Sequence, residues 1–177
     1  GVIYEAPVEG SITRLMAIIE DYDNIPRIGS VRSCRDYFLF YANEYDAIYS
    51  HYGQAVYALQ YLDQHLIDNL NGLTLGNAYY RSTDRVAPHN AYTDFSHLQA
   101  GIQSQGYSQD YKEDYNGHFQ FAPEGTETTL DDGVSANVVS LIISLTTIRG
   151  LSTMQRLRST AASSLMHRIL TRTQVIS

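Results

Sequence analysis

The sequence predicts an α/β domain, with a mixed or mostly parallel sheet and helices packed on it, followed by a truncated β-rich second unit. Short apolar runs alternate with segments of helical spacing over the first part of the chain, which is typical of α/β folds. After Tyr107 this pattern gives way to polar, acidic, turn-rich sequence. The chain has 177 residues, 44% of them hydrophobic, which is enough to bury a core.

The first elements are two strands and a helix. VIYEA at 2–6 indicates a strand, and the apolar run 15–19 favours a strand buried on both faces, ended by a polar turn at 21–24. Apolar side chains then recur at spacings of three and four from 33 to 46, which predicts an amphipathic helix capped by Ser33. These side chains are Cys34, Phe38, Tyr41 and Tyr45.

A second strand–helix pair follows directly. The β-prone segment 46–53 predicts a strand that closes at Gly53, and 54–66 predicts a helix whose apolar face is Val56, Leu59 and Leu62. The next segment, 71–93, is rich in Gly, Asn and Thr and predicts loops around a short strand at 78–81.

A third helix is predicted over 94–107. Thr93 is its expected N-cap, Gly106 its expected end, and Phe95, Leu98 and Ile102 its apolar face. Beyond it, HFQFA at 118–122 is a candidate strand within a polar linker. We therefore divide the chain into a first domain, 1–120, and a linker or start of a second domain, 121–140.

Charge separates the remaining tail from the rest of the chain. Residues 1–140 carry seven Lys and Arg against 19 Asp and Glu, a net charge of −12, whereas 141–177 carry five Arg and no acid. A strongly acidic body repels nucleic acid and anionic lipid, so nucleic-acid binding is excluded as a main function. The chain also has no run of 18 apolar residues, the length that a spanning helix needs.

Five of the seven cations of the acidic body lie in three turn-bearing segments, GSITR, IGSVRSCRDY and YYRSTDRVAPHN. Guanidinium groups bind phosphate or carboxylate bidentately, and adjacent Gly and Ser residues allow backbone amides to face an anion. The pattern predicts an anion-binding pocket at the strand ends, formed by Arg14, Arg32, Ser33, Arg35, Arg85, His89 and Asn90. Alternatively, the arginines pair with acidic residues to order loops; the candidates are Glu5, Glu9, Asp36 and Asp84.

Other chemistries have weaker support. Cys34 could act as a nucleophile with His51 or His89 as base, but it lies on the apolar face of its predicted helix, where a thiol is usually inert. The six histidines show no zinc-ligand spacing, and 21–24 lacks the later glycine and glutamate of a calcium loop. No metal site is predicted and no cofactor is assigned. The 15 tyrosines fit either a carbohydrate-stacking surface or a core.

Four stretches carry a family resemblance: VIYEAPVEGSITRLMAIIEDYDNIPRIGSVRSCRDYF, DAIYSHYGQAVYALQYL, NLNGLTL and YYRSTDRVAPHNAYT. Together they resemble the amino-terminal domain of the YerB-like bacterial lipoprotein family, a domain of unknown function (DUF3048), over about residues 1–120. The matching positions are Glu5, Gly10, Thr13, Arg14, Gly29, Val31, Arg32, Ser33, Arg35, Arg81, Arg85, Pro88, His89, Asn90, Tyr92 and Thr93.

The resemblance implies an extracytoplasmic protein, attached to the membrane only through a lipidated cysteine upstream of Gly1. Cys34 is not that cysteine, because it lies inside the domain. No established activity comes with the family, so whether the protein is an enzyme stays open. We expect an anionic envelope component or small ligand as partner. A weaker similarity to cell-wall glycopolymer ligases of the LytR-CpsA-Psr type suggests an alternative, transfer of a phosphoglycan.

The tail 141–177 departs from this resemblance. Family members continue with a segment of the type NPWFEYN, which is absent here. Synonymous codons for LIISLTTIRGLSTMQ can be chosen that, read one base earlier, encode PNYIAYDNPWFEYN. We therefore predict that 141–177 is an out-of-frame tail, in preference to a membrane-surface helix or a targeting segment. An indel near codon 140 in the coding DNA would confirm this, and such a tail would pack loosely.

Overall fold

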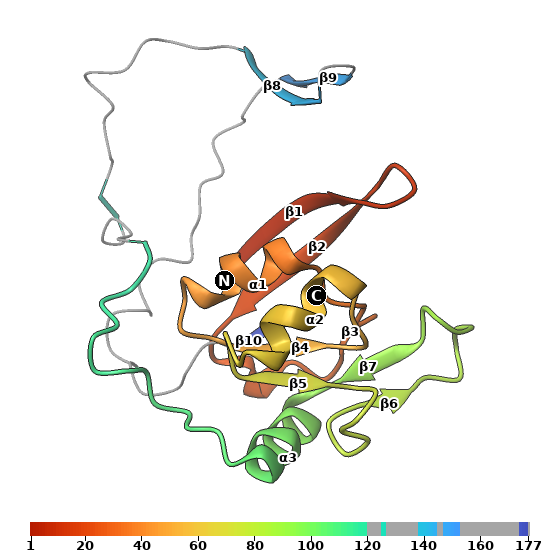
Figure 1. The fold of residues 1–177 in the computed structure, drawn as a ribbon, viewed down its shortest axis with the longest axis vertical. Helices are drawn as coiled ribbons and strands as arrows, with labels where there is room; N and C mark the ends of the chain where they lie inside the picture. The colour runs from red at the N-terminus through yellow and green to blue at the C-terminus, as the bar shows by residue number, and fades with distance from the viewer. Residues whose placement is uncertain (120–124, 127–137, 145–146, 153–173, 177) are drawn as a thin grey trace. The chain divides into compact units, whose positions relative to one another are not determined.

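The structure is a computed structural model that describes residues 1–119, 125–126, 138–144, 147–152 and 174–176 (Figure 1). The chain forms two units, one of Gly1–His118 with Leu170–Ser177 and one of Phe119–Ile169. In the second unit the structure describes an antiparallel hairpin of β8 (Val138–Ser144) and β9 (Thr147–Ser152). The first unit carries the candidate site and confirms the predicted mixed α/β class.

A five-stranded mixed sheet, in the order β1-β2-β10-β4-β5, forms the centre of the first unit. The strands β1 and β2 form an antiparallel hairpin, β10 is antiparallel to β2, and β10, β4 and β5 are mutually parallel along the sheet. Their bounds are Val2–Val8 for β1, Ile12–Ile19 for β2, Gln174–Ile176 for β10, Ile48–His51 for β4 and Asn69–Asn71 for β5.

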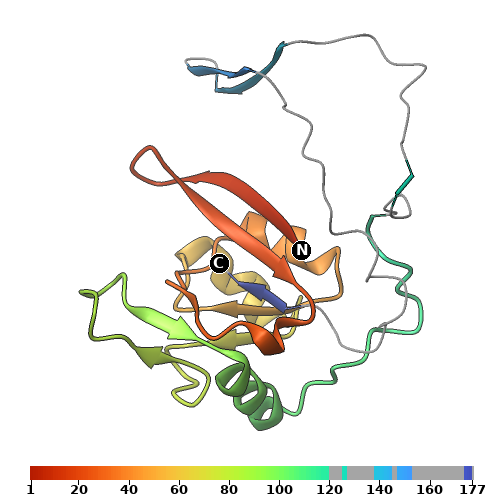
Figure 2. The same ribbon diagram turned by 180° about the vertical axis from the view of Figure 1, so that it is seen from behind.

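Helices cover both faces of this sheet. Helices α1 (Asp36–Asn43) and α2 (Val56–Asp63) lie over one face, the one toward the viewer in Figure 1. Figure 2 shows the sheet from behind, where α3 (Phe95–Gln105) and the short 3-10 helix η1 (Tyr22–Asn24) lie. The α/β pattern of the sequence therefore produced the expected layered arrangement.

The core consists of two apolar clusters, one on each face, and β4 contributes to both. Tyr49 packs with Phe38 of α1 in the first cluster, and Ile48 packs with Leu98 of α3 in the second. Because successive side chains of a strand point to opposite faces, a strand between two helical layers is buried on both faces, and its two polar side chains, Ser50 and His51, are hydrogen-bonded. All four residues of β4 are buried, and the prediction of a strand at this position is confirmed.

The predicted first helix begins later than its sequence pattern suggests. Its N-cap is Arg35 in extended conformation, and Ser33 lies outside the helix. The Ser33 hydroxyl instead donates a hydrogen bond to the Tyr52 carbonyl oxygen at 3.2 Å. The prediction that Ser33 caps this helix is therefore wrong, because a bond to the end of β4 takes the hydroxyl away from the helix amides.

The apolar face predicted for the second helix is wrong for Val56 and Leu59, although Leu62 does pack on the core. Val56 is 77% exposed and Leu59 38%, whereas Ala58 is completely buried. A methyl side chain at the contact allows α2 to pack closely on the first cluster, with Tyr61 and Leu62 at its margin. Sequence spacing marks the larger side chains and passes over the small residue that makes the contact.

A second, antiparallel sheet in the order β3-β7-β6 lies beside the first, and sequence analysis found only its β6 strand. Its strands are β3 (Ile28–Gly29), β7 (Ala91–Thr93) and β6 (Tyr80–Arg81). Thr93 is part of β7, and its hydroxyl donates to the Ala78 carbonyl at 2.8 Å. The N-cap of α3 is therefore Asp94, which accepts from the His97 amide at 3.0 Å. Gly106 ends α3 at φ 68°, as predicted.

The strand predicted at 15–19 is longer and less buried than expected. It begins at Ile12, and Leu15 is 55% exposed. The β1–β2 hairpin extends past the helical layer in Figure 1. Helix α1 lies against one face of the hairpin, and side chains such as Leu15 stay exposed. Tyr4, on that covered face, stacks on Tyr41 of α1 with ring centroids 5.1 Å apart.

Most of the predicted strand at 118–122 and most of the tail 141–177 lie outside the described residues. The reading-frame origin of the tail stays a prediction. However, Gln174–Ile176 forms β10 inside the central sheet, so the expectation of a loosely packed tail does not hold for these three residues. Among the described residues, no helix has both the length and the apolar character that crossing a membrane requires.

Candidate anion-binding site

The segment 31–35, which carries two of the predicted arginines, is fixed between β7 and the end of β4. The Val31 amide donates to the Ala91 carbonyl at 2.8 Å, and the Tyr52 amide donates to the Arg32 carbonyl at 2.9 Å. The segment therefore lies at the carboxyl end of β4, one of the parallel strands. Ligands of α/β folds bind at such ends, which gives this position a physical reason to hold a site.

Two guanidinium groups meet at the Ser33 carbonyl oxygen, which accepts from Nη1 of Arg14 and, at 3.2 Å, from Nη1 of Arg35. Burial lowers the pKa of the Arg14 guanidinium, and the nearby charges of Arg35 and Arg32 lower it further. Within the described part of the chain, no carboxylate lies within 4 Å of Arg14. Arg14, Arg32 and Arg35 therefore lie close together in the structure, and their positive charges repel one another.

Part of the alternative, in which the arginines pair with acidic residues, is also realised. Arg35 binds the Glu9 carboxylate through Nε and Nη2, with a shortest distance of 2.6 Å, and lowers the pKa of that carboxyl. Asp84 pairs with Arg27, which the sequence analysis did not consider, at 2.9 Å. Glu5 accepts a hydrogen bond from the Thr13 hydroxyl at 2.6 Å. Arg35 therefore has a carboxylate partner, whereas Arg14 has none within 4 Å among the described residues.

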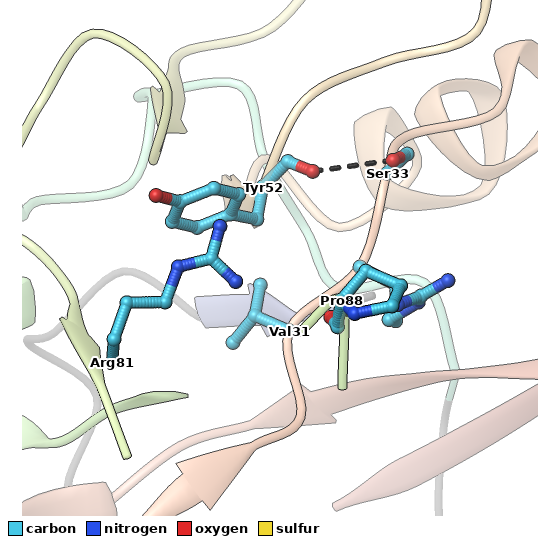
Figure 3. A pocket seen from close by; sticks show the side chains of 6 residues that line it. Val31, Ser33, Tyr52, Arg81 and Pro88 are labelled. Atoms are coloured by element: carbon cyan, nitrogen blue, oxygen red, sulfur yellow. Dashed lines mark hydrogen bonds between the residues drawn. The ribbon is translucent and has the colours of Figure 1, made fainter. Parts of the chain in front are cut away.

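A small recess of about 70 Å³ adjoins this cluster (Figure 3). The guanidinium carbon of Arg81 lies 4.3 Å from the centre of the Tyr52 ring, and Arg81 donates to Asn90 Oδ1 at 2.7 Å. Opposite, Arg32 donates to the Pro88 carbonyl at 2.8 Å. The recess is lined by Val31, Arg32, Ser33, Tyr52, Arg81 and Pro88.

The loop 82–90 contributes less to the recess than predicted. Pro88 reaches it, but Arg85 and His89 are exposed and are not among its lining residues. The other predicted residue of this loop, Asn90, does not line the recess but accepts a hydrogen bond from Arg81, which does. The Asn90 side chain also donates to the Ser82 carbonyl at 3.2 Å. The structure therefore brings together Arg14, Arg32, Ser33 and Arg35, with Asn90 supporting Arg81, and leaves Arg85 and His89 outside.

Four residues of the recess were not among the predicted site residues, namely Val31, Tyr52, Arg81 and Pro88, and two of them, Arg81 and Tyr52, contact each other. Arg81 belongs to the short strand β6, and its pairing with β7 places it beside Asn90. Its occurrence in one of the three cation-bearing segments was the available signal. Tyr52 had no signal of its own, because its role depends on the stacking of Arg81 on its ring.

The alternative chemistry at Cys34 has no support in the geometry. Cys34 is completely buried, and burial raises the pKa of its thiol to about 12. His51, one of its two candidate bases, is itself buried and donates from Nδ1 to the Gly53 carbonyl at 2.7 Å. Cys34 is therefore a core residue, as predicted, although it precedes α1 and forms a β-bridge with Gln54 instead of lying on the helix. Among the described residues no group of three or more His, Cys, Asp or Glu is arranged to hold a metal.

Burial of His51 predicts a pH dependence of stability. Burial lowers the pKa of His51 below its ordinary value of 6.5, although its bonds to Gly53 and to Asn69 favour the charged ring. Below pH 6.5 the unfolded chain binds a proton at this residue that the folded chain does not. The free energy of unfolding should therefore decrease as the pH is lowered below 6.5, by at most about 1.4 kcal/mol per pH unit.

Urea denaturation at pH 7, 6 and 5 measures this slope. His51→Gln should reduce it, and the matched change His65→Gln at an exposed histidine should leave it unchanged. An equal slope in the wild-type and His51→Gln chains would show that another group causes the pH dependence.

The arginine cluster and the recess lie within a domain that matches a known protein family. The model of the family "Protein of unknown function (DUF3048) N-terminal domain" matches residues 1–108, more than half of the chain. The chain belongs to the DUF3048 family. The resemblance found in the sequence is confirmed, and the DUF3048 domain contains the whole arginine cluster and the recess.

The DUF3048 domain is also similar to a protein of Bacillus subtilis (strain 168) named "Putative lipoprotein YerB". The two are 34% identical over 108 residues, which cover 60% of this chain and 32% of that protein. The crystal structure of the YerB protein from Bacillus subtilis matches with a TM-score of 0.56 at 34% identity, over 60% of this chain and 37% of that one. The chain thus spans about a third of the length of this relative.

Proposed function

We propose that this DUF3048 domain binds a small anionic group, a phosphate or a carboxylate, carried by a component of the cell envelope. The observation that carries the proposal is that two arginines, Arg32 and Arg81, line one recess. Ser33 contributes to the same lining, and its carbonyl oxygen accepts hydrogen bonds from Arg14 and Arg35. Guanidinium groups held at one place favour a bidentate oxyanion.

Arg81 is prepared for such a ligand. The Tyr52 ring and the Asn90 side chain fix its position, and one hydrogen bond to Asn90 leaves other N–H donors of the five on a guanidinium. Within the described part of the chain, no carboxylate lies within 4 Å of Arg81. A preorganised cation loses little side-chain entropy when it binds, which favours affinity for an anion.

The size of the recess limits the ligand. Its volume of about 70 Å³ is well below the roughly 300–1,000 Å³ of pockets that enclose a drug-sized molecule. The recess therefore accommodates one anionic group, with the rest of the ligand outside. Envelope components fit the proposed location, because the name of the similar YerB protein describes a lipoprotein and implies attachment outside the cytoplasm. No observation on the described residues favours the alternative of phosphoglycan transfer.

Thermal denaturation with inorganic phosphate, pyrophosphate or acetate, each against chloride at equal ionic strength, tests the proposal. Phosphate or acetate should raise the Tm of the wild-type chain, because a ligand that binds only the folded state stabilises it. Arg81→Gln and Arg32→Gln should weaken anion affinity by about tenfold or more, the effect expected for loss of a charged hydrogen bond. Whether phosphate or acetate protects better distinguishes the two anion classes.

The matched control is Arg85→Gln, which removes the same charge from the exposed loop beside the recess. It should retain the full protection by the anion. If Arg85→Gln loses protection as strongly as Arg81→Gln, or if neither changes it, the anion acts through general charge or another site and the proposal fails.

A further inference from the structure

The central sheet contains a gap that is one strand wide. Strands β2 and β4 do not bond to each other, and β10 lies between them, as the blue strand in Figure 2 shows. Val175 is paired with Ile18 of β2 on one side and with Tyr49 of β4 on the other. The segment that fills the gap is remote in sequence from both of its neighbours.

An empty gap would be costly at this place. The facing edges of β2 and β4 carry backbone N–H and C=O groups that need partners, and unpaired buried groups of this kind are strongly unfavourable. The side chains on either side are apolar: Ile18 and Tyr49 belong to one core cluster and Ile48 to the other. The segment that fills the gap must therefore be an extended strand whose side chains can lie among apolar residues on both faces of the sheet.

The strand that occupies the gap is short. It forms three residue pairs with β2 and three with β4, as many as join β4 to β5, whereas β1 and β2 share seven. The chain leaves the first unit after His118 and returns to it at Leu170, so the closed loop is long and its closure costs entropy. A short strand on such a long tether can exchange with a free peptide of the same sequence.

We propose that the gap between β2 and β4 is a binding site for an extended apolar peptide strand, occupied in this chain by its own residues 174–176. The occupant runs parallel to β4 and antiparallel to β2, so its direction is fixed. Recognition is mainly through the backbone, as in strand addition to a sheet edge, but here both edges of the peptide are paired. This site is independent of the arginine recess and of the ligand proposed for it.

The test uses the full chain and a fluorescent peptide of residues 171–177, followed by fluorescence anisotropy. Val175→Pro in the chain should open the gap, because proline lacks an N–H and is excluded from interior strands. This variant should bind the peptide saturably. The same peptide carrying Val175→Pro is the matched control and should bind at least tenfold more weakly. The wild-type chain should also bind more weakly, because its tethered strand competes.

If the Val175→Pro chain retains its circular dichroism spectrum and binds neither peptide, or binds both equally, the proposal is wrong. A second measurement does not depend on that variant. A fluorophore on Ser177→Cys can be attached selectively, because Cys34 is buried with a raised pKa. Excess unlabelled peptide should displace the labelled end and lower its anisotropy. An unchanged anisotropy at saturating peptide would show a fixed strand and overturn the proposal.

Discussion

Replacing Phe38 with alanine is expected to lower the free energy of unfolding by about 3–5 kcal/mol, the range found when a large aromatic side chain is removed from a core. Phe38 is completely buried in the cluster that joins α1 to the central sheet. Its ring lies 4.8 Å from that of Tyr37 and 6.5 Å from that of Tyr41, so truncation leaves a cavity and removes aromatic contacts. Urea denaturation followed by circular dichroism measures the change.

The matched control for Phe38 is two residues away on the same helix. Phe40 is 43% exposed and makes one edge-to-face contact, with Tyr61 at 4.9 Å. Phe40→Ala should cost about 1 kcal/mol, the value of a single aromatic pair. If the two variants lose equal stability, the face of α1 that packs on the sheet is not the one described here.

The second large effect is the protection of Cys34 from thiol reagents. Only the thiolate reacts, and burial raises the pKa of Cys34 from 9.0 to about 12. At pH 8 the thiolate fraction in the folded chain should be about a thousandfold below that of an exposed thiol. The folded chain should therefore react with dithionitrobenzoate at about a thousandth of the ordinary rate or less, since burial also restricts access.

Two controls accompany this measurement. The same chain in guanidinium chloride should react at the ordinary rate, and Cys34→Ser should give no signal. Fast modification of the folded wild-type chain would contradict the burial of Cys34 and would reopen its role as a nucleophile.

The sequence predicted those elements whose signal is local. The strand β4 follows from the β-prone residues of the segment 46–53 and from the glycine that closes it, Gly53. The end of α3 at Gly106 follows from the left-handed conformation that glycine adopts readily. In both cases neighbouring residues alone determine the outcome.

Other elements depend on partners that are distant in sequence. The short strand β5 exists because β4 pairs with it, and its residues, Asn69–Asn71, have no strand propensity of their own. The buried face of α2 depends on how closely the helix approaches the sheet, so Ala58 replaced the larger residues that spacing had marked. A single sequence carries neither piece of information.

The same distinction applies to the site. Because cations are scarce in this acidic chain, their positions in the sequence were sufficient to predict a cluster of Arg14, Arg32 and Arg35. The structure places these arginines around one residue, Ser33. It was not sufficient to exclude Arg85, because exposure depends on the course of the loop. Nor could it favour Arg81, whose position depends on strand pairing and on the ring of Tyr52.

The contact between Arg81 and Tyr52 also marks a position where a fluorescent side chain would report on the recess. The chain contains no tryptophan, so Tyr52→Trp would introduce its sole indole directly beneath a guanidinium group. Indole emission responds to nearby charge and can be excited apart from the other tyrosines. Titration of that single fluorophore would follow events in the recess without a labelled ligand and without unfolding the protein.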